Sequence, residues 1–261
     1  MTNSELQKKY NGSWVHDFLI ALVFLTRLPV RLNIQFSMKN VGLASRVFAL
    51  IGIIVGGLSA GVYWLAFNVG IPPVLGAMLA VSAQIILTGA LHEDAIGDVA
   101  DGFGGGVDKD KKLEIMRDSR VGTYAVVTLI LIIGIKVSAI ASYPGTWFTF
   151  GILLSAATCS RGLMGAAMYF MPAARADGLG ASAGRPPVSA ALTSLAFAII
   201  IPVILLGPYA GSIAVFSAIA GALFIGFIAY RQIGGQTGDV LGSIQQISEC
   251  AFFISMAAFI S

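Results

Sequence analysis

The sequence predicts an all-α polytopic integral membrane protein with about seven transmembrane helices and a short N-terminal interfacial or re-entrant helix. Of its 261 residues, 57% are hydrophobic and 11% are charged, whereas roughly a quarter of the residues in an ordinary soluble domain carry a charge. A spanning helix needs about 20 apolar residues, and the chain holds several separate stretches of that length. We therefore expect a single membrane-embedded domain over residues 1–261.

The N-terminal segment, residues 1–40, precedes the first full span. Its apolar stretch from Phe18 to Thr26 is interrupted by Arg27 and Pro29. It lacks the small-residue cleavage site that follows the apolar part of a signal peptide, and it is too short to cross a bilayer. We therefore expect an interfacial or re-entrant helix here.

Seven later stretches are long and apolar enough to cross the membrane. Cys159 and Cys250 lie inside two of them and are expected to be packing residues, with no disulfide framework and no metal site of the Cys-x-x-Cys type. The expected spans are 42–67, 74–91, 124–142, 148–170, 188–207, 212–230 and 244–260.

Charged residues divide the connections between spans into two sets. The connections 68–73, 142–147 and 207–211 contain no Lys or Arg. The alternate connections carry both signs of charge, and the positive-inside rule places them, with the N-terminal segment, in the cytoplasm. Every Asp and Glu except Glu249 lies on that side, so we expect the working site there. The net charge of +3 is too small to indicate a nucleic-acid partner.

The most informative segment, LHEDAIGDVADGFGGG (91–106), directly follows the second expected span. Asp94, Asp98 and Asp101 stand at i, i+4 and i+7, which places three carboxylates on one face of a helix. Like charges this close repel one another unless a cation lies between them. Mg²⁺ binds one or two carboxylates together with waters and phosphate oxygens. The spacing predicts that these three residues hold Mg²⁺ against a phosphate or diphosphate; a solvated helix extension is the alternative.

The residues on either side of the three aspartates have less specific roles. His92 and Glu93 either support the aspartates or act as a general base, and an ordinary polar pair at the membrane surface is the alternative. Glycines at 102 and 104–106 are expected to end the helix and to let the backbone approach a phosphate closely.

Basic residues follow in the same connection, in LEIMRDSRVGT (113–123). Arg117, Ser119 and Arg120 are candidate ligands of phosphate oxygens, because arginine binds them in a bidentate way. Asp118 is expected either to orient one arginine or to join the metal site. An amphipathic surface helix is the alternative reading of this segment.

Two basic residues, Lys136 and Arg161, lie well inside expected spans. Lys136 is expected to snorkel or to make an interhelical contact, because a charge inside a bilayer is costly. Arg161 lies about two turns from the cytoplasmic end of its span, from which it could reach an anionic ligand.

The last charged connection contains Gly235, Gln236, Thr237 and Asp239 just before the final span. Exposed amides there are expected to bind phosphate or ribose oxygens, with a simple polar turn as the alternative. The small-residue loop 172–187 is expected to be either a lid over the site or a linker.

Five motifs together resemble those of the cobalamin synthase (adenosylcobinamide-GDP ribazoletransferase) family. They occur in the expected order over nearly the whole chain. In one departure, the family usually shows DGLAD where this chain has DAIGD (94–98), which keeps the aspartate spacing and moves the glycine. The motifs are FLTRLPV (24–30), LHEDAIGDVADG (91–102), LEIMRDSRVGT (113–123), DGLG (177–180) and GGQTGDVLG (234–242).

The resemblance implies a late step of cobalamin biosynthesis at the cytoplasmic face of a bacterial inner membrane, in contact with membrane lipid. A hydroxyl of α-ribazole, or of its 5′-phosphate, would attack the cobinamide-linked phosphate of adenosylcobinamide-GDP, and GMP would leave. Mg²⁺ and arginines would neutralise the phosphates; a homo-oligomer is compatible with the sequence. The implied roles are Mg²⁺ binding by Asp94, Asp98 and Asp101, phosphate contact by Arg117, Arg120 and Arg161, and proton acceptance by Asp118, Asp239 or Glu93.

Three other functions compete with this interpretation. Membrane prenyltransferases and CDP-alcohol phosphotransferases also bind Mg²⁺ with aspartates, but their characteristic acid spacings are absent from this sequence. An ion-coupled transporter would explain the charges within spans, but transporters place coupling acids near the bilayer midplane. Here the acids collect at one surface.

Overall fold

The computed structural model describes residues 12–31, 36–145 and 147–260, and this part of the chain is built from helices. It contains no strand, only an isolated parallel bridge between Ala173 and Gln236. A 3₁₀ turn, Ser45–Val47, joins α2 to α3. Expectations for residues 1–11 lie outside the described residues. The helices are α1 (Trp14–Leu25), α2 (Met38–Ala44), α3 (Phe48–Asn68), α4 (Pro73–Thr88), α5 (Leu91–Gly105), α6 (Lys109–Ile115), α7 (Thr123–Ala141), α8 (Trp147–Phe170), α9 (Leu179–Ala183), α10 (Val188–Leu206), α11 (Pro208–Ile233) and α12 (Gly238–Ile260).

Six helical segments of the described chain are long and apolar enough to cross a membrane, and the bent pair α4–α5 makes up to seven. The prediction of an all-α polytopic membrane protein is confirmed. The largest difference concerns the last span, expected from residue 244, because α12 already begins at Gly238. Its first turns carry glycine, serine and glutamine, which lower hydropathy, yet these side chains are buried against other helices.

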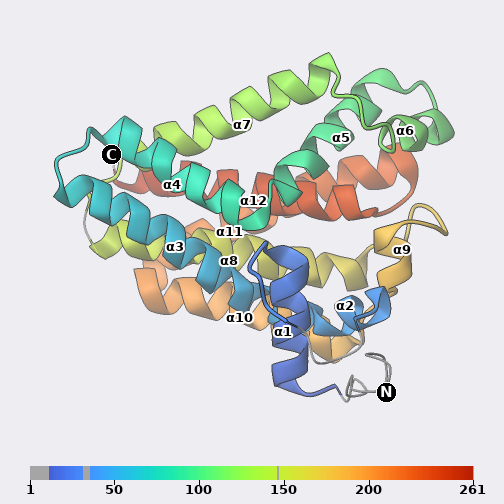
Figure 1. Ribbon diagram of the computed structural model, residues 1–261, viewed down its shortest axis with the longest axis horizontal. Helices are drawn as coiled ribbons and strands as arrows, with labels where there is room; N and C mark the ends of the chain where they lie inside the picture. The colour runs from blue at the N-terminus through green and yellow to red at the C-terminus, as the bar shows by residue number, and fades with distance from the viewer. Residues whose placement is uncertain (1–11, 32–35, 146, 261) are drawn as a thin grey trace.

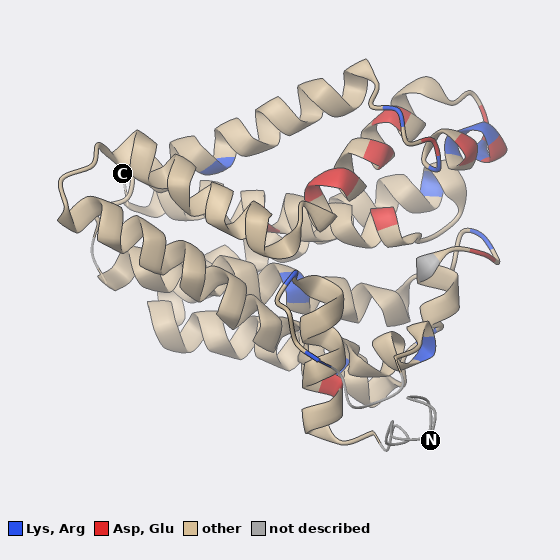
Figure 2. Cartoon of the chain, in the orientation of Figure 1, with Lys and Arg blue, Asp and Glu red and all other residues tan. Residues whose placement is uncertain are grey.

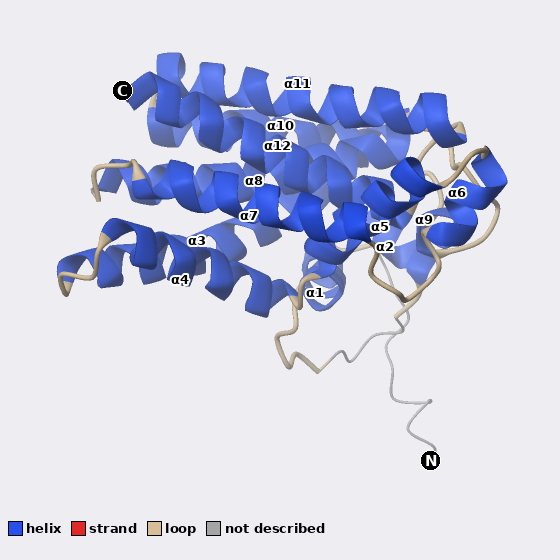
Figure 3. Ribbon diagram, turned by 90° about the horizontal axis from the view of Figure 1, so that it is seen from above, coloured by secondary structure: helices blue, strands red, loops and turns tan. Residues whose placement is uncertain are grey.

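The long helices lie side by side along the longest axis of the molecule, and α1 runs across them (Figure 1). Seen from above, α3 and α4 form one side of the bundle and α10, α11 and α12 the other, with α7 and α8 between them (Figure 3). The short α1 packs against α2 and α3. Its length of 12 residues and its crosswise direction agree with the expected interfacial or re-entrant helix.

Small residues allow α3 and α8 to approach closely. A Cβ atom on Gly56 would lie 2.7 Å from the Cα atom of Leu154, so any larger residue there would push the helices apart. Glycine at such a contact is typical of helix packing in membranes, where close backbone approach supplies much of the attraction.

The chain breaks sharply between α4 and α5. Gly89 and Ala90 both adopt left-handed backbone angles, with φ of 65° and 58°, and α5 leaves at 89° to α4. A left-handed alanine costs roughly 1 kcal/mol or more, so surrounding contacts must hold it. In one of these contacts, the backbone N–H of Arg27 donates to the carbonyl of Leu87 at 2.7 Å. The acidic segment is therefore a separate helix, not a continuation of the expected span 74–91.

Buried polar contacts join four helices in the interior of the bundle. Lys136 Nζ of α7 donates to Glu249 Oε2 of α12 at 2.6 Å. Gln84 Nε2 of α4 donates to the other carboxylate oxygen at 2.8 Å, and Arg161 Nη1 of α8 lies 3.8 Å from it. All four residues are at most 5% exposed. The interhelical contact expected for Lys136 is present.

We predict that Lys136→Met destabilises the fold by about 3–5 kcal/mol, because it leaves a buried carboxylate without its main cation. Glu249→Gln should also destabilise the fold by about 3–5 kcal/mol, because it leaves the buried Lys136 and Arg161 without their carboxylate. Thermal unfolding in detergent measures both, with the exposed Lys111→Met as the matched control. A Lys136→Met protein as stable as the Lys111→Met control would show that the ion pair does not hold the bundle together.

Candidate active site

Charged residues gather at the end of the molecule formed by α5, α6 and the loop before α9 (Figure 2). The opposite end holds the α3–α4 and α7–α8 connections and the C-terminus (Figure 1). Glycines 102 and 104–106 lie where α5 ends, as the sequence predicted, with Gly106 as its C-cap. Apart from the buried contacts around Glu249, much of the charge of the described chain therefore lies at one end of the bundle.

The acidic face of α5 lies beside the start of α12. Asp94 is exposed and Asp98 is half-buried. Burial, together with the neighbouring carboxylates of Asp94, Asp239 and Asp101, raises the pKa of Asp98 to about 7. Among the described residues, no Lys or Arg forms an ion pair with Asp94 or Asp98. The cluster is thus an un-neutralised group of acids that a cation would stabilise.

Asp101 has a different environment from the other two aspartates of α5. Its carboxylate accepts the backbone N–H groups of Gly122, at 2.6 Å, and of Ala125, at 3.0 Å. These groups belong to the first turn of α7, whose N–H groups have no partner within the helix. In the described part of the chain, no three His, Cys, Asp or Glu side chains gather as a metal site. Both carboxylate oxygens of Asp101 are thus engaged in capping α7, which distinguishes it from Asp94 and Asp98.

The basic segment 113–123 pairs its arginines with acids. Arg117 Nη2 donates to both carboxylate oxygens of Asp177, at 2.6 and 2.7 Å. Arg120 binds Asp118 through Nε at 3.0 Å and Nη2 at 2.5 Å, and these hydrogen bonds lower the pKa of Asp118 to about 2. Ser119 is exposed. Both ion pairs are solvent-exposed, so they are weak and a phosphate could displace the carboxylates.

The loop before α12 is buried, which corrects the expectation of exposed amides at Gly235, Gln236 and Thr237. The Gln236 N–H donates to Pro172 at 2.8 Å, and its carbonyl accepts from Ala174 at 2.9 Å. Thr237 Oγ1 accepts the N–H of Val240 at 3.2 Å. These groups fasten the loop 172–187 and begin α12, so they are not available to a phosphate. That loop also contains α9.

Two further candidate site residues, Glu93 and Arg161, lie inside the bundle. Glu93 Oε1 accepts a hydrogen bond from Gln246 Nε2 at 2.9 Å, and Glu93 is 7% exposed. Arg161 is fully buried and faces Glu249. The expectation that Arg161 reaches a phosphate at the polar end is wrong for this structure, because its guanidinium is held in the interior.

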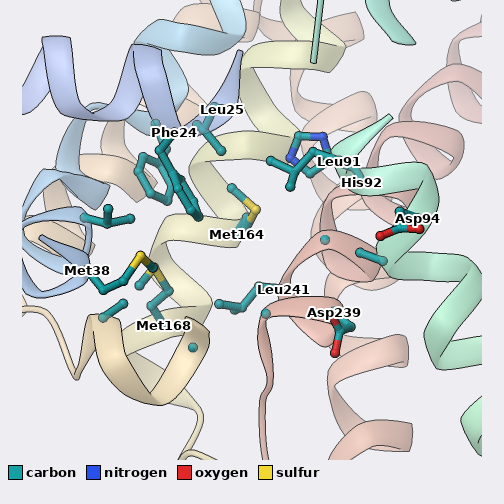
Figure 4. A pocket seen from close by; sticks show the side chains of 17 residues that line it. Phe24, Leu25, Met38, Leu91, His92, Asp94, Met164, Met168, Asp239 and Leu241 are labelled. Carbon is teal, nitrogen blue, oxygen red and sulfur yellow. The ribbon is translucent and has the colours of Figure 1, made fainter. Parts of the chain in front are cut away.

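An apolar cavity of about 140 Å³ adjoins the acidic cluster. Figure 4 shows Asp94 and Asp239 on one side of it and Phe24, Met164 and Met168 on the other. Sequence analysis missed this cavity, because its walls come from apolar residues of separate helices that carry no motif. It also missed a role for Arg175, whose Nη2 atom lies 3.8 Å from Asp239 Oδ2.

Comparisons with known proteins agree on one family. A family model described as cobalamin-5-phosphate synthase (CobS) matches residues 17–257. An adenosylcobinamide-GDP ribazoletransferase of Bradyrhizobium diazoefficiens is 39% identical over 245 residues, which cover 94% of this chain and 94% of the relative. Proteins of the same name from Mesorhizobium japonicum and a Sinorhizobium species are 39% and 36% identical, over 94% of this chain and 94% and 97% of theirs.

No solved structure matches the chain significantly. The family model covers most of the sequence, including all five motifs. The chain therefore belongs to the cobalamin-5-phosphate synthase (CobS) family.

Proposed function

We propose that this chain is an adenosylcobinamide-GDP ribazoletransferase that joins adenosylcobinamide-GDP to α-ribazole, or to its 5′-phosphate, with release of GMP. The observation that carries the proposal is the juxtaposition of un-neutralised carboxylates on α5 with an apolar cavity. A nucleoside substrate has a polar sugar and an apolar base, and such a site offers one environment to each. Relatives of this name align with 94% of the chain.

The proposed reaction is a transfer of a phosphoryl group between two oxygen atoms. A ribose hydroxyl oxygen bonds to the cobinamide-linked phosphorus, and the bond from that phosphorus to the bridging oxygen breaks. GMP leaves with the bridging oxygen, and the hydroxyl proton passes to a carboxylate. Such a reaction requires positioning and charge neutralisation more than covalent participation by the protein.

We assign Mg²⁺ binding to Asp94 and Asp98. The donor chemistry fits, because Mg²⁺ takes one or two protein carboxylates and completes its shell with water and substrate phosphate oxygens. No cationic side chain in the described structure neutralises this pair. When bound, the ion would neutralise charge on the diphosphate. Arg117 and Arg120, at the same end of the molecule, are proposed to bind the remaining phosphate oxygens.

We assign proton acceptance to Asp239. It borders the cavity, and its nearest cation, Arg175, is 3.8 Å away. The two other candidates are less suited. Asp118 accepts three hydrogen bonds from the Arg120 side chain, and Glu93 lies behind the site with Gln246.

We further propose that the site faces the cytoplasm of a bacterial inner membrane. The connections at this end of the bundle carry the Lys and Arg residues, whereas the opposite connections, 68–73, 142–147 and 207–211, carry none. Cytoplasmic loops of membrane proteins are enriched in these residues.

We predict that Asp98→Asn lowers turnover by at least about 100-fold, since it removes a proposed Mg²⁺ ligand while keeping the side chain's size. GMP release by purified protein in liposomes, with adenosylcobinamide-GDP and α-ribazole 5′-phosphate, measures this. Asp110→Asn, a change at an exposed acid of α6, is the matched control. Wild-type turnover in the Asp98 variant would refute the assignment.

We predict that EDTA abolishes GMP release by the wild-type protein and that added Mg²⁺ restores it. In Asp94→Asn, the Mg²⁺ concentration giving half-maximal rate should rise about tenfold or more, because one proposed ligand has lost its charge. A titration of rate against free Mg²⁺ provides both results. Full turnover in EDTA would contradict a role for the metal.

A further inference from the structure

The cavity beside the acidic cluster has walls suited to a flat apolar group. Phe24 and Phe48 stack at 6.3 Å with 22° between their ring planes, and both line the cavity. Met38, Met164 and Met168 line it as well. Thioether sulfur makes favourable contacts with aromatic rings, and methionine adapts to their shape. These walls favour an aromatic ligand over a flexible polar one.

Polar side chains of the cavity lie on the α5 and α12 side. Asp94 and Asp239 are two of them, and His92 is the third. His92 is 2% exposed, and its Nε2 atom has no hydrogen-bond partner. A buried polar atom without a partner is unfavourable in a folded protein, so a ligand that offers a hydrogen bond to His92 would be stabilised. Figure 4 shows the His92 ring beside Leu91, at the edge of the cavity.

We propose that this cavity binds the aromatic base of the nucleoside substrate, with the His92 Nε2–H donating a hydrogen bond to a ring nitrogen of the base and the ribose at Asp94 and Asp239. The inference rests on the proposed function and assigns the residues that recognise one of its substrates. The base of α-ribazole is a dimethylated benzimidazole: planar, apolar, and with one ring nitrogen not bonded to the sugar. Its ribose carries hydroxyl donors for carboxylates, and the reacting hydroxyl then lies beside the proposed Mg²⁺ ligands.

A cavity-filling variant tests the location. Ala183 of α9 lines the cavity and is 5% exposed. Ala183→Phe should raise the KM for α-ribazole 5′-phosphate about tenfold or more, with the KM for adenosylcobinamide-GDP unchanged. Ser182→Phe changes the neighbouring exposed residue, which does not line the cavity, and should leave both constants unchanged. An unchanged KM for the ribazole in Ala183→Phe would overturn the location.

An enlarging variant keeps the test independent of any folding defect in Ala183→Phe. Met164→Ala should increase kcat/KM for a riboside phosphate with a bulkier naphthimidazole base relative to the benzimidazole substrate. The gain requires a folded protein. A folded Met164→Ala protein whose preference between the two bases equals that of the wild type would count against the cavity.

Replacement of one atom in the ligand tests His92. The wild-type protein should prefer the benzimidazole riboside phosphate to the corresponding indole riboside phosphate, which has carbon in place of the free nitrogen, by about tenfold or more in kcat/KM. His92→Phe should abolish this preference, because it removes the partner atom while retaining the ring. A preference that survives in His92→Phe would show that another group reads the nitrogen.

A binding measurement separates failure of this inference from failure of the proposed function. Equilibrium dialysis of radiolabelled α-ribazole 5′-phosphate against the detergent-solubilised protein requires no turnover. Binding that Ala183→Phe abolishes and Ser182→Phe retains supports the cavity even if no GMP is released, and the absence of turnover then counts against the proposed reaction alone. Turnover together with ribazole binding that Ala183→Phe leaves intact refutes the cavity and leaves the reaction standing.

Discussion

The arrangement of the bundle depends on the contacts of one buried carboxylate, that of Glu249 in the middle of α12. It binds Lys136 of α7 and Gln84 of α4, and Gln246, one turn earlier on α12, binds Glu93 of α5. A buried charge is tolerated only when it is paired and hydrogen-bonded, so these helices have little freedom to shift. Because Glu93 adjoins the acidic face of α5, the same contacts fix where that face points.

Hydropathy predicted most of the fold because lipid requires long apolar helices, whatever packs against them. Hydropathy did not predict the helix boundaries that depend on packing inside the protein. Four of residues 238–243 are small or polar in sequence, yet they belong to α12, and residues 240–243 are buried at its start. The break after α4 was also missed, because Gly89 alone is compatible with a continuous helix, and a left-handed Ala90 is imposed by contacts with distant residues.

The candidate site was predicted only in part, again because packing between distant segments is not visible in the sequence. The spacing of Asp94, Asp98 and Asp101 correctly placed three carboxylates along one helix, but it could not show that Asp101 faces the first turn of α7. Likewise, the polar residues before α12 were visible in the sequence, whereas their hydrogen bonds to residues 172–174 depend on tertiary structure. Motifs identify which chemistry is present, and the packing of distant segments decides which side chains remain free for it.

The hydrogen bond from Arg27 to Leu87 has a consequence for how the protein is made. The carbonyl of Leu87 belongs to the last turn of α4 and cannot be satisfied by the broken helix itself. The Arg27 side chain also lies over Gly89, where a Cβ atom would come within 2.8 Å of its Cγ atom. The residues that follow α1 can therefore make their final contacts only once α4 and the break after it have formed.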